Sequence, residues 1–410
     1  MLDRSVPPTS GRCLTSSVPT KPSPITWPLL LVLAALAALA PVATDLYLPG
    51  FPAMADDLGA DASAVQLTLT SFLVGLAFGQ LVMGPLSDRY GRRRPLLASA
   101  AVCVVAGVVC ATAPSLGVLV VARLVQGFAG AGGMVIGRAV ISDLVTGRAA
   151  AKAFTLMLTV GGVAPVLAPL VGGLLAGPVG WRGMLWTVAG LCAAMLVGVL
   201  VMIPETRPPE VRAAASTSSR AALRTLVSSR GYWGPVAVFG LSFAVMMAYI
   251  SASPFVYQSV VGLSEIGYGL AFGVNAAGLI AAGSVTSRLV DRIEPRRLVR
   301  AAITVQLLAT LAFVLLTQVG APAWTFPVAI FVAVTSNGAI MGNAAALAMS
   351  QVRPIAGTGS AVLGFTQFAL GAVVSPLVGL GSADSAVVPA LVMAGASGLG
   401  FTVSRVSLRR

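Results

Sequence analysis

The stretch GPLSDRYGRRR, residues 84–94, puts one acid and four arginines between two long apolar segments. So many charges in one short turn cannot lie in hydrocarbon, where polar groups without water or a partner are costly. The turn must therefore lie in water at one face of a membrane. Short loops rich in Arg and Lys stay on the cytoplasmic face. The stretch thus predicts a cytoplasmic turn between two membrane-spanning helices.

The composition indicates the same class of protein along the whole chain. Hydrophobic residues make up 57% of it and charged residues 10%, which is far from the balance of a soluble globular domain. A helix needs about 20 apolar residues to cross a bilayer. We predict an all-α integral membrane fold with twelve spanning helices, at 27–52, 63–87, 95–113, 116–141, 152–177, 184–203, 232–254, 265–287, 298–317, 323–349, 357–381 and 386–404.

The net charge of +13 raises the question of nucleic-acid binding, and the distribution of the charge argues against it. Of the 26 Lys and Arg residues, all but Arg123, Arg138 and Arg182 lie in the tails or in the loops on the same side as 84–94. Bases gathered on one side of the membrane are a topology signal. We expect both termini in the cytoplasm, a bacterial plasma-membrane location and no nucleic-acid partner.

One long charged break, residues 204–231, divides the helices into six and six. The second half repeats part of the first, because Leu86, Asp88 and Arg89 recur as Leu289, Asp291 and Arg292 after the second helix of each half. Repeated halves are typical of secondary transporters, whose site lies between them. We predict a disordered cytoplasmic tail at 1–26, six-helix bundles at 27–203 and 232–404, a cytoplasmic linker at 204–231 and a cytoplasmic tail at 405–410.

The chain contains no histidine. Histidine-based catalysis, histidine metal ligands and histidine proton shuttles are therefore excluded. Cys13 lies in the first tail, and Cys103, Cys110 and Cys192 lie within apolar segments, where a thiol acts as a small packing group. We expect no cofactor, no metal and no enzyme activity.

Two charges lie deep within predicted spans. Asp45 is near the outer end of the first helix, and Arg123 is about two turns into the fourth from its outer end. A charge within a span costs roughly 2.5–3.5 kcal/mol on insertion scales, so such residues usually have a partner or a function. Because the two helices run in opposite directions, both charges should lie at similar depth. We predict that Asp45 binds the proton and that Arg123 is its counter-charge. An interfacial acid at a proline-kinked helix end is the alternative for Asp45.

The charged turn resembles the loop motif of the major facilitator superfamily of transporters, Gly-x-Leu-(Ser/Ala)-Asp-Arg-x-Gly-Arg-Arg. The matching residues are Gly84, Leu86, Ser87, Asp88, Arg89, Gly91, Arg92 and Arg93. In the fourth helix, Arg123, Gln126 and Gly127 match the family's Arg-x-x-Gln-Gly. The resemblance implies two six-helix bundles that rock against each other.

The fifth predicted helix resembles the motif of the family's exporters, Gly-x-x-x-Gly-Pro-x-x-Gly-Gly. Pro169, Gly172 and Gly173 match, and Pro165 and Pro169 should bend the helix. Several stretches also resemble the Bcr/CflA subfamily of bacterial drug:proton antiporters. They are TDLYLPGFPAMADDLGA (44–60), RAVISDL (138–144), APVLAPLVGG (164–173), GWRGMLW (180–186) and IPET (203–206).

The family resemblance also implies a cytoplasmic gate. Asp88 would lie at the amino end of the helix that begins near Gly357, where free backbone N–H groups favour an anion. Asp143 would receive Arg89 or Arg92. Together these contacts would latch the two halves on the inner side.

We therefore expect a monomeric proton-coupled antiporter that exports amphipathic drugs, neutral or zwitterionic ones such as amphenicols. A second acid that relatives exporting cations can carry in the first helix has no counterpart here. Gln126, Tyr249 and Asn337 are the predicted cavity residues. A proton-coupled importer of a small metabolite is the alternative, and a membrane enzyme or receptor is a more distant one.

Overall fold

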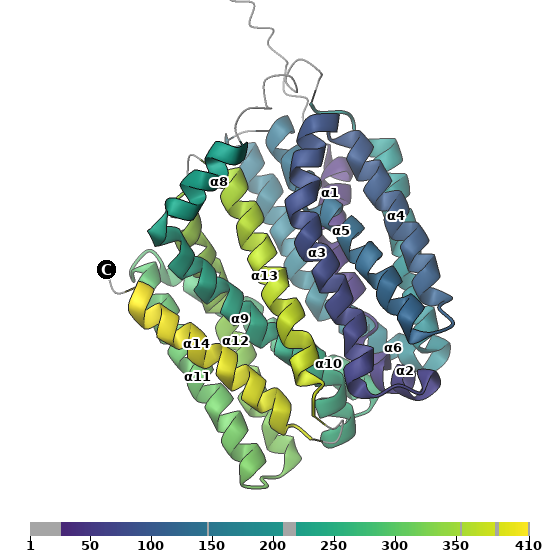
Figure 1. Ribbon diagram of the computed structural model, residues 1–410, viewed down its shortest axis with the longest axis vertical. Helices are drawn as coiled ribbons and strands as arrows, with labels where there is room; N and C mark the ends of the chain where they lie inside the picture. Colours follow the sequence, from purple (N-terminus) through teal and green to yellow (C-terminus); the bar gives the residue numbers. More distant parts are fainter. Residues whose placement is uncertain (1–25, 146, 208–218, 353–354, 382–384, 409–410) are drawn as a thin grey trace, which may run out of the picture.

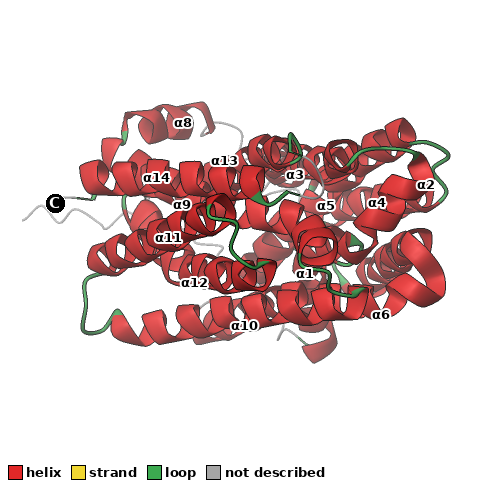
Figure 2. Cartoon of the chain, turned by 90° about the horizontal axis from the view of Figure 1, so that it is seen from below, coloured by secondary structure: helices red, strands yellow, loops and turns green. Residues whose placement is uncertain are grey.

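The computed structural model describes residues 26–145, 147–207, 219–352, 355–381 and 385–408, and their regular structure is helical throughout (Figure 2). Apolar segments in lipid become helices because a helix satisfies its own backbone hydrogen bonds. In chain order the elements are α1 (Trp27–Asp45), η1 (Leu48–Gly50), α2 (Phe51–Leu58), α3 (Ala62–Tyr90), α4 (Arg93–Ala111), α5 (Leu116–Leu144), α6 (Gly147–Met202), α8 (Ser219–Ser228), α9 (Arg230–Phe255), η2 (Val256–Val260), α10 (Glu265–Leu289), α11 (Pro295–Gln318), η3 (Ala323–Thr325), α12 (Phe326–Ser350), α13 (Ala356–Val378) and α14 (Val387–Ser407).

The 56-residue helix α6 crosses the membrane twice. A straight helix of this length would span about 84 Å, against about 30 Å of hydrocarbon. Gly180 interrupts it with φ 63° and ψ −178°, a left-handed φ that glycine adopts without strain. Gly172 packs on Leu46 at the end of α1, whereas Gly198 packs on Val32 near its start. The chain therefore reverses near Gly180, and the eleven long apolar segments found in the described residues hold twelve crossings.

Glycines bring the helices of the first half close together. A Cβ at Gly127 would lie 2.1 Å from the carbonyl oxygen of Phe72, and a Cβ at Gly75 would lie 2.2 Å from that of Leu124. No larger residue fits at either position, so α3 and α5 pack backbone to backbone, as small residues allow in membranes. This contact fixes the rotation of α5, which carries Arg123.

The molecule has two chemically different ends. The basic end carries Arg92, Arg93 and Arg207, and α8 lies at this end beside the second half (Figure 1). The distal end carries α2 and η2, with the acids Asp56 and Asp57. We use these two names below.

The two halves meet most closely at the distal end. There Gln66 Nε2 donates a hydrogen bond of 3.2 Å to the carbonyl of Ser251, and Gln258 Nε2 donates one of 3.2 Å to the carbonyl of Pro49. Across the described residues, these are the hydrogen bonds that join one half to the other. Helices α3 and α13 converge toward the same end (Figure 1). The structure is thus closed at the distal end.

The predicted all-α membrane fold is confirmed. Three predicted segments lie partly outside the described residues. They are the first tail up to position 25, the linker over 208–218 and the last two residues of the chain. The ranges assigned to the two bundles and to the linker stay a prediction.

Candidate functional site

A cavity of about 290 Å³ lies between the two halves. Its wall is mostly apolar and includes four methionines and four aromatic rings. They are Met134, Met246, Met247, Met341, Phe243, Tyr249, Phe272 and Phe368. Methionine side chains are flexible and polarizable, so they adapt to ligands of different shape. Such a wall suits an apolar or aromatic small molecule.

Among the described residues of this wall, Asp45 carries the only carboxyl group. It ends α1 and is 3% exposed. The hydroxyl of Thr44 donates a hydrogen bond of 2.9 Å to Asp45 Oδ1. Burial makes the charged form of a carboxyl group costly, and a neutral hydroxyl compensates only part of that cost. Asp45 is therefore suited to gain and lose a proton as its surroundings change.

Arg123 is completely buried and is held by neutral groups. Its Nη1 donates to Gln126 Oε1 at 2.8 Å, and its Nη2 donates to the carbonyl of Ala43 at 2.9 Å. The guanidinium carbon lies 4.5 Å from the ring centre of Tyr47 and 4.3 Å from that of Phe72. Stacking between a cation and aromatic rings stabilises a desolvated guanidinium by about 2 kcal/mol or more.

The predicted contact between Asp45 and Arg123 needs correction for this state. The two residues do lie at similar depth, since Arg123 reaches the carbonyl two residues before Asp45. However, no ion pair joins them in the described structure. Asp45 lines the central cavity, whereas Arg123 is enclosed between α1, α3 and α5. In this state Arg123 therefore contacts the last turn of α1, at the carbonyl of Ala43, and not Asp45 itself.

Of the three predicted cavity residues, the structure places one in the cavity wall and two outside it. Tyr249 lies in the wall of the cavity. Gln126 and Asn337 do not, because each is taken up by a buried partner. Gln126 accepts from Arg123, and Asn337 Oδ1 accepts a 2.5 Å hydrogen bond from the hydroxyl of Ser242.

The exporter-like motif lies where α6 touches both halves. A Cβ at Gly172 would lie 2.0 Å from the carbonyl oxygen of Leu46, in α1's own half, and a Cβ at Gly173 would lie 2.6 Å from that of Glu265 in α10. Pro169 also touches α10, at Gly269, while Pro165 lines the cavity. Gly172 thus lets α6 pack closely on α1 within the first half, and Gly173 permits the contact with α10 that helps to close the distal end.

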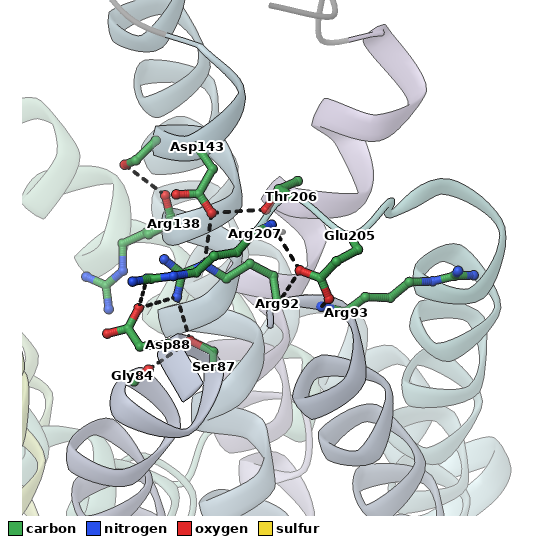
Figure 3. A network of polar contacts seen from close by, with 11 residues as sticks. Gly84, Ser87, Asp88, Arg92, Arg93, Arg138, Asp143, Glu205, Thr206 and Arg207 are labelled. Carbon is green, nitrogen blue, oxygen red and sulfur yellow. Dashed lines mark hydrogen bonds and ion pairs between the residues drawn. The ribbon is translucent and has the colours of Figure 1, made fainter. Parts of the chain in front are cut away.

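Arg92 is the centre of a polar cluster at the basic end (Figure 3). Its Nε donates to Asp143 Oδ2 at 2.9 Å, and its Nη1 donates to Asp88 Oδ1 and to Ser87 Oγ, both at 2.8 Å. Burial lowers the pKa of Arg92, but the ion pairs with Asp143 and Asp88 outweigh it and hold that pKa above its usual value. Arg92 stays charged at any physiological pH.

The turn before Arg92 shows why position 91 favours glycine and why two other motif residues are less constrained. Gly91 has φ 88°, which favours glycine and lets the chain turn from α3 into α4. A Cβ at Gly84 would only meet Val135 at 3.7 Å. Arg89 is exposed and lies over the ring of Tyr90 at 5.4 Å.

Sequence reasoning missed the contribution of the segment after α6 (Figure 3). Glu205 accepts hydrogen bonds from the backbone N–H groups of Arg92 and Arg93, and so caps the start of α4. Arg207 pairs with Asp88, and Thr206 donates to Asp143 at 3.0 Å. In the sequence, the stretch IPET (203–206) indicates only a resemblance to a subfamily. Its acid, Glu205, follows directly after a predicted span, and that position could have indicated a role at the membrane surface.

Asp88 does not lie at the start of α13 in this structure. Its partners are Arg92 and Arg207, and the space where a Cβ at Gly357 would point is open. The reason is the closed distal end, which leaves the two halves apart at the basic end. The predicted latch therefore stays a prediction for the opposite conformation.

Two six-helix halves with a cavity between them are the architecture of a membrane transporter. The chain belongs to the Major Facilitator Superfamily, whose family model matches residues 33–376. It is a multi-pass protein of the bacterial plasma membrane.

Several bacterial proteins resemble the chain over most of its length. It is 36% identical to "Uncharacterized MFS-type transporter YdgK" of Bacillus subtilis, over 86% of this chain and 88% of that protein. It is 31% identical to "Bicyclomycin resistance protein homolog" of Haemophilus influenzae, over 87% and 90%. It is 29% identical to "Multidrug resistance protein MdtL" of Escherichia coli O157:H7, over 81% and 83%. These relatives confirm the resemblance to the bacterial drug:proton antiporters.

Solved structures share the fold. The D-xylose-proton symporter matches with a TM-score of 0.74 at 15% sequence identity, covering 94% of this chain and 98% of that one. The xylose transporter XylE from E. coli, in a partially occluded inward open conformation, matches with a TM-score of 0.70 at 14% identity, covering 92% and 96%. At these identities the likeness concerns the fold alone.

Proposed function

We propose that this chain exports amphipathic small molecules, in particular neutral or zwitterionic drugs such as amphenicols, in exchange for protons. The observation that carries the proposal is the cavity, in whose apolar wall Asp45 supplies a carboxyl group. The names of the relatives, which refer to bicyclomycin and multidrug resistance, support a drug as the substrate. Both halves of one chain enclose the cavity, so a monomer suffices.

The geometry supports an exchange cycle. With the distal end closed, a substrate enters from the basic end and occupies the wall beside Asp45. Drug in the cavity favours loss of the proton from Asp45. Opening at the distal end then lets the drug leave and exposes Asp45 to the more acidic side, where it is protonated again. Differential binding of drug and proton to the two conformations is what drives the exchange.

The direction of transport is supported by the contacts of α6. Gly172 and Gly173 permit close contact at the distal end, and the motif to which they belong resembles that of exporters. A tight distal seal keeps protons from leaking inward while the cavity takes up its substrate from the cytoplasm.

The orientation of the chain can be tested with single cysteines. We expect the basic end and both termini in the cytoplasm, because arginines gather there. In a variant lacking the native cysteines, Ala60→Cys should react with an impermeant thiol reagent on intact cells, and Ser228→Cys should react only after the cells are opened. Labelling of position 228 but not of position 60 on intact cells would refute this topology.

The latch can be tested with a pair of matched substitutions. Asp88→Asn removes the anion that would face the start of α13 in the outward-open state, and that interaction is worth about 0.3–1 kcal/mol. We expect it to raise the rate at which a thiol reagent labels Met134→Cys, in the cavity, from the basic end by about two- to fivefold. Asp57→Asn is the control, because Asp57 has the same 47% side-chain exposure and also pairs with an arginine, but at the distal end. Equal labelling rates in wild type and Asp88→Asn, together with lost export, would contradict the latch.

Drug export itself is tested in a bacterial host that lacks its own efflux pumps. Expression of the chain should raise the inhibitory concentration of chloramphenicol, and a protonophore should abolish the effect in a direct assay of drug accumulation. Proton-driven uptake of a metabolite, with no change in drug susceptibility, would favour the importer alternative instead.

A further inference from the structure

A cluster of buried polar side chains in the second half includes one residue of the cavity wall, Tyr249. The Asn275 side chain, in α10, donates one hydrogen bond of 2.9 Å to Tyr249 Oη and another of 3.0 Å to Tyr257 Oη. All three residues are almost fully buried, with at most 3% exposure. Polar groups are costly to bury at this depth, so those that occur there often have a function. The exchange cycle described above does not use Asn275 or Tyr257.

The number of hydrogens on each group determines which one donates in these hydrogen bonds. Asn275 uses the two hydrogens of its NH₂ group, one for each phenol, so both phenol oxygens act as acceptors there. A phenol has a single proton, and Asn275 Nδ2 cannot accept it. In the part of the chain that the structure describes, the Tyr249 hydroxyl donates no hydrogen bond. The Tyr249 proton is therefore available to another group.

Tyr249 differs from Tyr257 in its position. Tyr249 lies in the cavity wall, where its ring stacks on Phe272 with centres 5.3 Å apart, whereas Tyr257 does not line the cavity. Asp45, on the first-half wall, lines the same cavity as Tyr249. The hydroxyl of Thr44, also in the wall, already lies near Asp45 and near the carbonyl of Pro41.

We propose that Tyr249, oriented by Asn275, is a substrate-recognition residue that donates a hydrogen bond to an acceptor oxygen of the transported molecule. This inference rests on the proposed function and adds to it a substrate class. The favoured molecule has an aromatic or apolar body, an acceptor such as a nitro or amide oxygen toward the second half, and a hydroxyl or amine donor toward Asp45. The side-chain amide of Gln367 adds a further adaptable polar contact.

Chloramphenicol is a suitable probe because it is neutral and carries both acceptor oxygens and hydroxyl donors. Its dissociation constant is measured by isothermal titration on the full-length protein in detergent. Tyr249→Phe keeps the ring and removes the donor, so chloramphenicol binding should weaken about 3- to 10-fold, as expected for one hydrogen bond. Tyr257→Phe removes the other phenol that Asn275 holds and should leave the affinity within about twofold of wild type.

Asn275→Leu supplies the test of orientation. It should weaken binding to a similar extent as Tyr249→Phe, and the double variant should bind no more weakly than Tyr249→Phe alone, because both changes remove the same contact. A purely structural role of Asn275 would instead make the two losses add. If Asn275→Leu does not fold, the comparison of Tyr249→Phe with Tyr257→Phe still tests whether Tyr249 binds the substrate.

Three results would overturn the proposal. Tyr249→Phe could bind chloramphenicol as tightly as wild type, Tyr257→Phe could lose as much affinity as Tyr249→Phe, or the losses in the double variant could add. A wild-type protein that does not bind chloramphenicol at all would refute the proposed amphenicol export itself, and the recognition role of Tyr249 with it.

Discussion

Asp45→Asn should abolish proton-driven drug export while leaving a folded, membrane-inserted protein. Asparagine resembles the protonated carboxyl group in shape but cannot release a proton. The substitution also removes the cost of burying a charge in the cavity wall, so the fold should tolerate it. The measurement is chloramphenicol accumulation in inside-out membrane vesicles with an imposed pH gradient, which should fall to the level of vesicles without the transporter.

Asp56→Asn is the matched control for this experiment. Asp56 is an exposed acid at the distal end, outside the cavity wall, and its loss should change export by less than about twofold. Asp45→Asn should still bind chloramphenicol, because a neutral drug does not require the carboxylate. Vesicles of Asp45→Asn that respond to the pH gradient as wild type does would contradict the role of Asp45.

Arg123→Ala should reduce both export and stability. The change removes two charge-assisted hydrogen bonds, to Gln126 and to the carbonyl of Ala43, and two aromatic contacts. Each such bond contributes about 1.5–3 kcal/mol, so the melting temperature should drop by several degrees. Export should fall at least about tenfold, because the last turn of α1, which positions Asp45, loses its anchor.

One further substitution separates charge from geometry at this position, and another in the same helix serves as a control. Arg123→Lys keeps the charge but cannot reach both acceptors with a planar fork, so its export should lie between those of wild type and Arg123→Ala. Arg138→Ala, in the same helix, removes bonds to Met134 and Gln80 near the basic end and should have a smaller effect. Full activity of Arg123→Lys would show that charge alone matters and would restore the idea of a direct counter-charge.

Hydropathy predicted the helices well because the bilayer imposes one dominant constraint on each of them. It also predicted the two crossings that the structure joins into α6, since no apolar helix of that length fits in a membrane. The charged turn around Arg92 was equally readable, because its acids and bases are close in sequence and must lie in water.

The contacts of the buried polar residues were not predictable to the same extent. Sequence gives the depth of Arg123 and Asp45 but not the rotation of their helices, since every face of these helices is apolar. The structure shows that Arg123 binds a backbone carbonyl, which no sequence pattern marks. Likewise, no sequence pattern marks Asn275 as the partner of two tyrosines, because the three side chains meet only in the fold.

The central claim is that Asp45 exchanges its proton for the drug, and drug-induced proton release tests it most directly. Wild-type protein in weakly buffered detergent solution, with a pH-sensitive dye, should release protons when chloramphenicol is added. Asp45→Asn should release none above the baseline of buffer alone, although it binds the drug. Equal release by Asp45→Asn and wild type would contradict the account and place the proton site elsewhere.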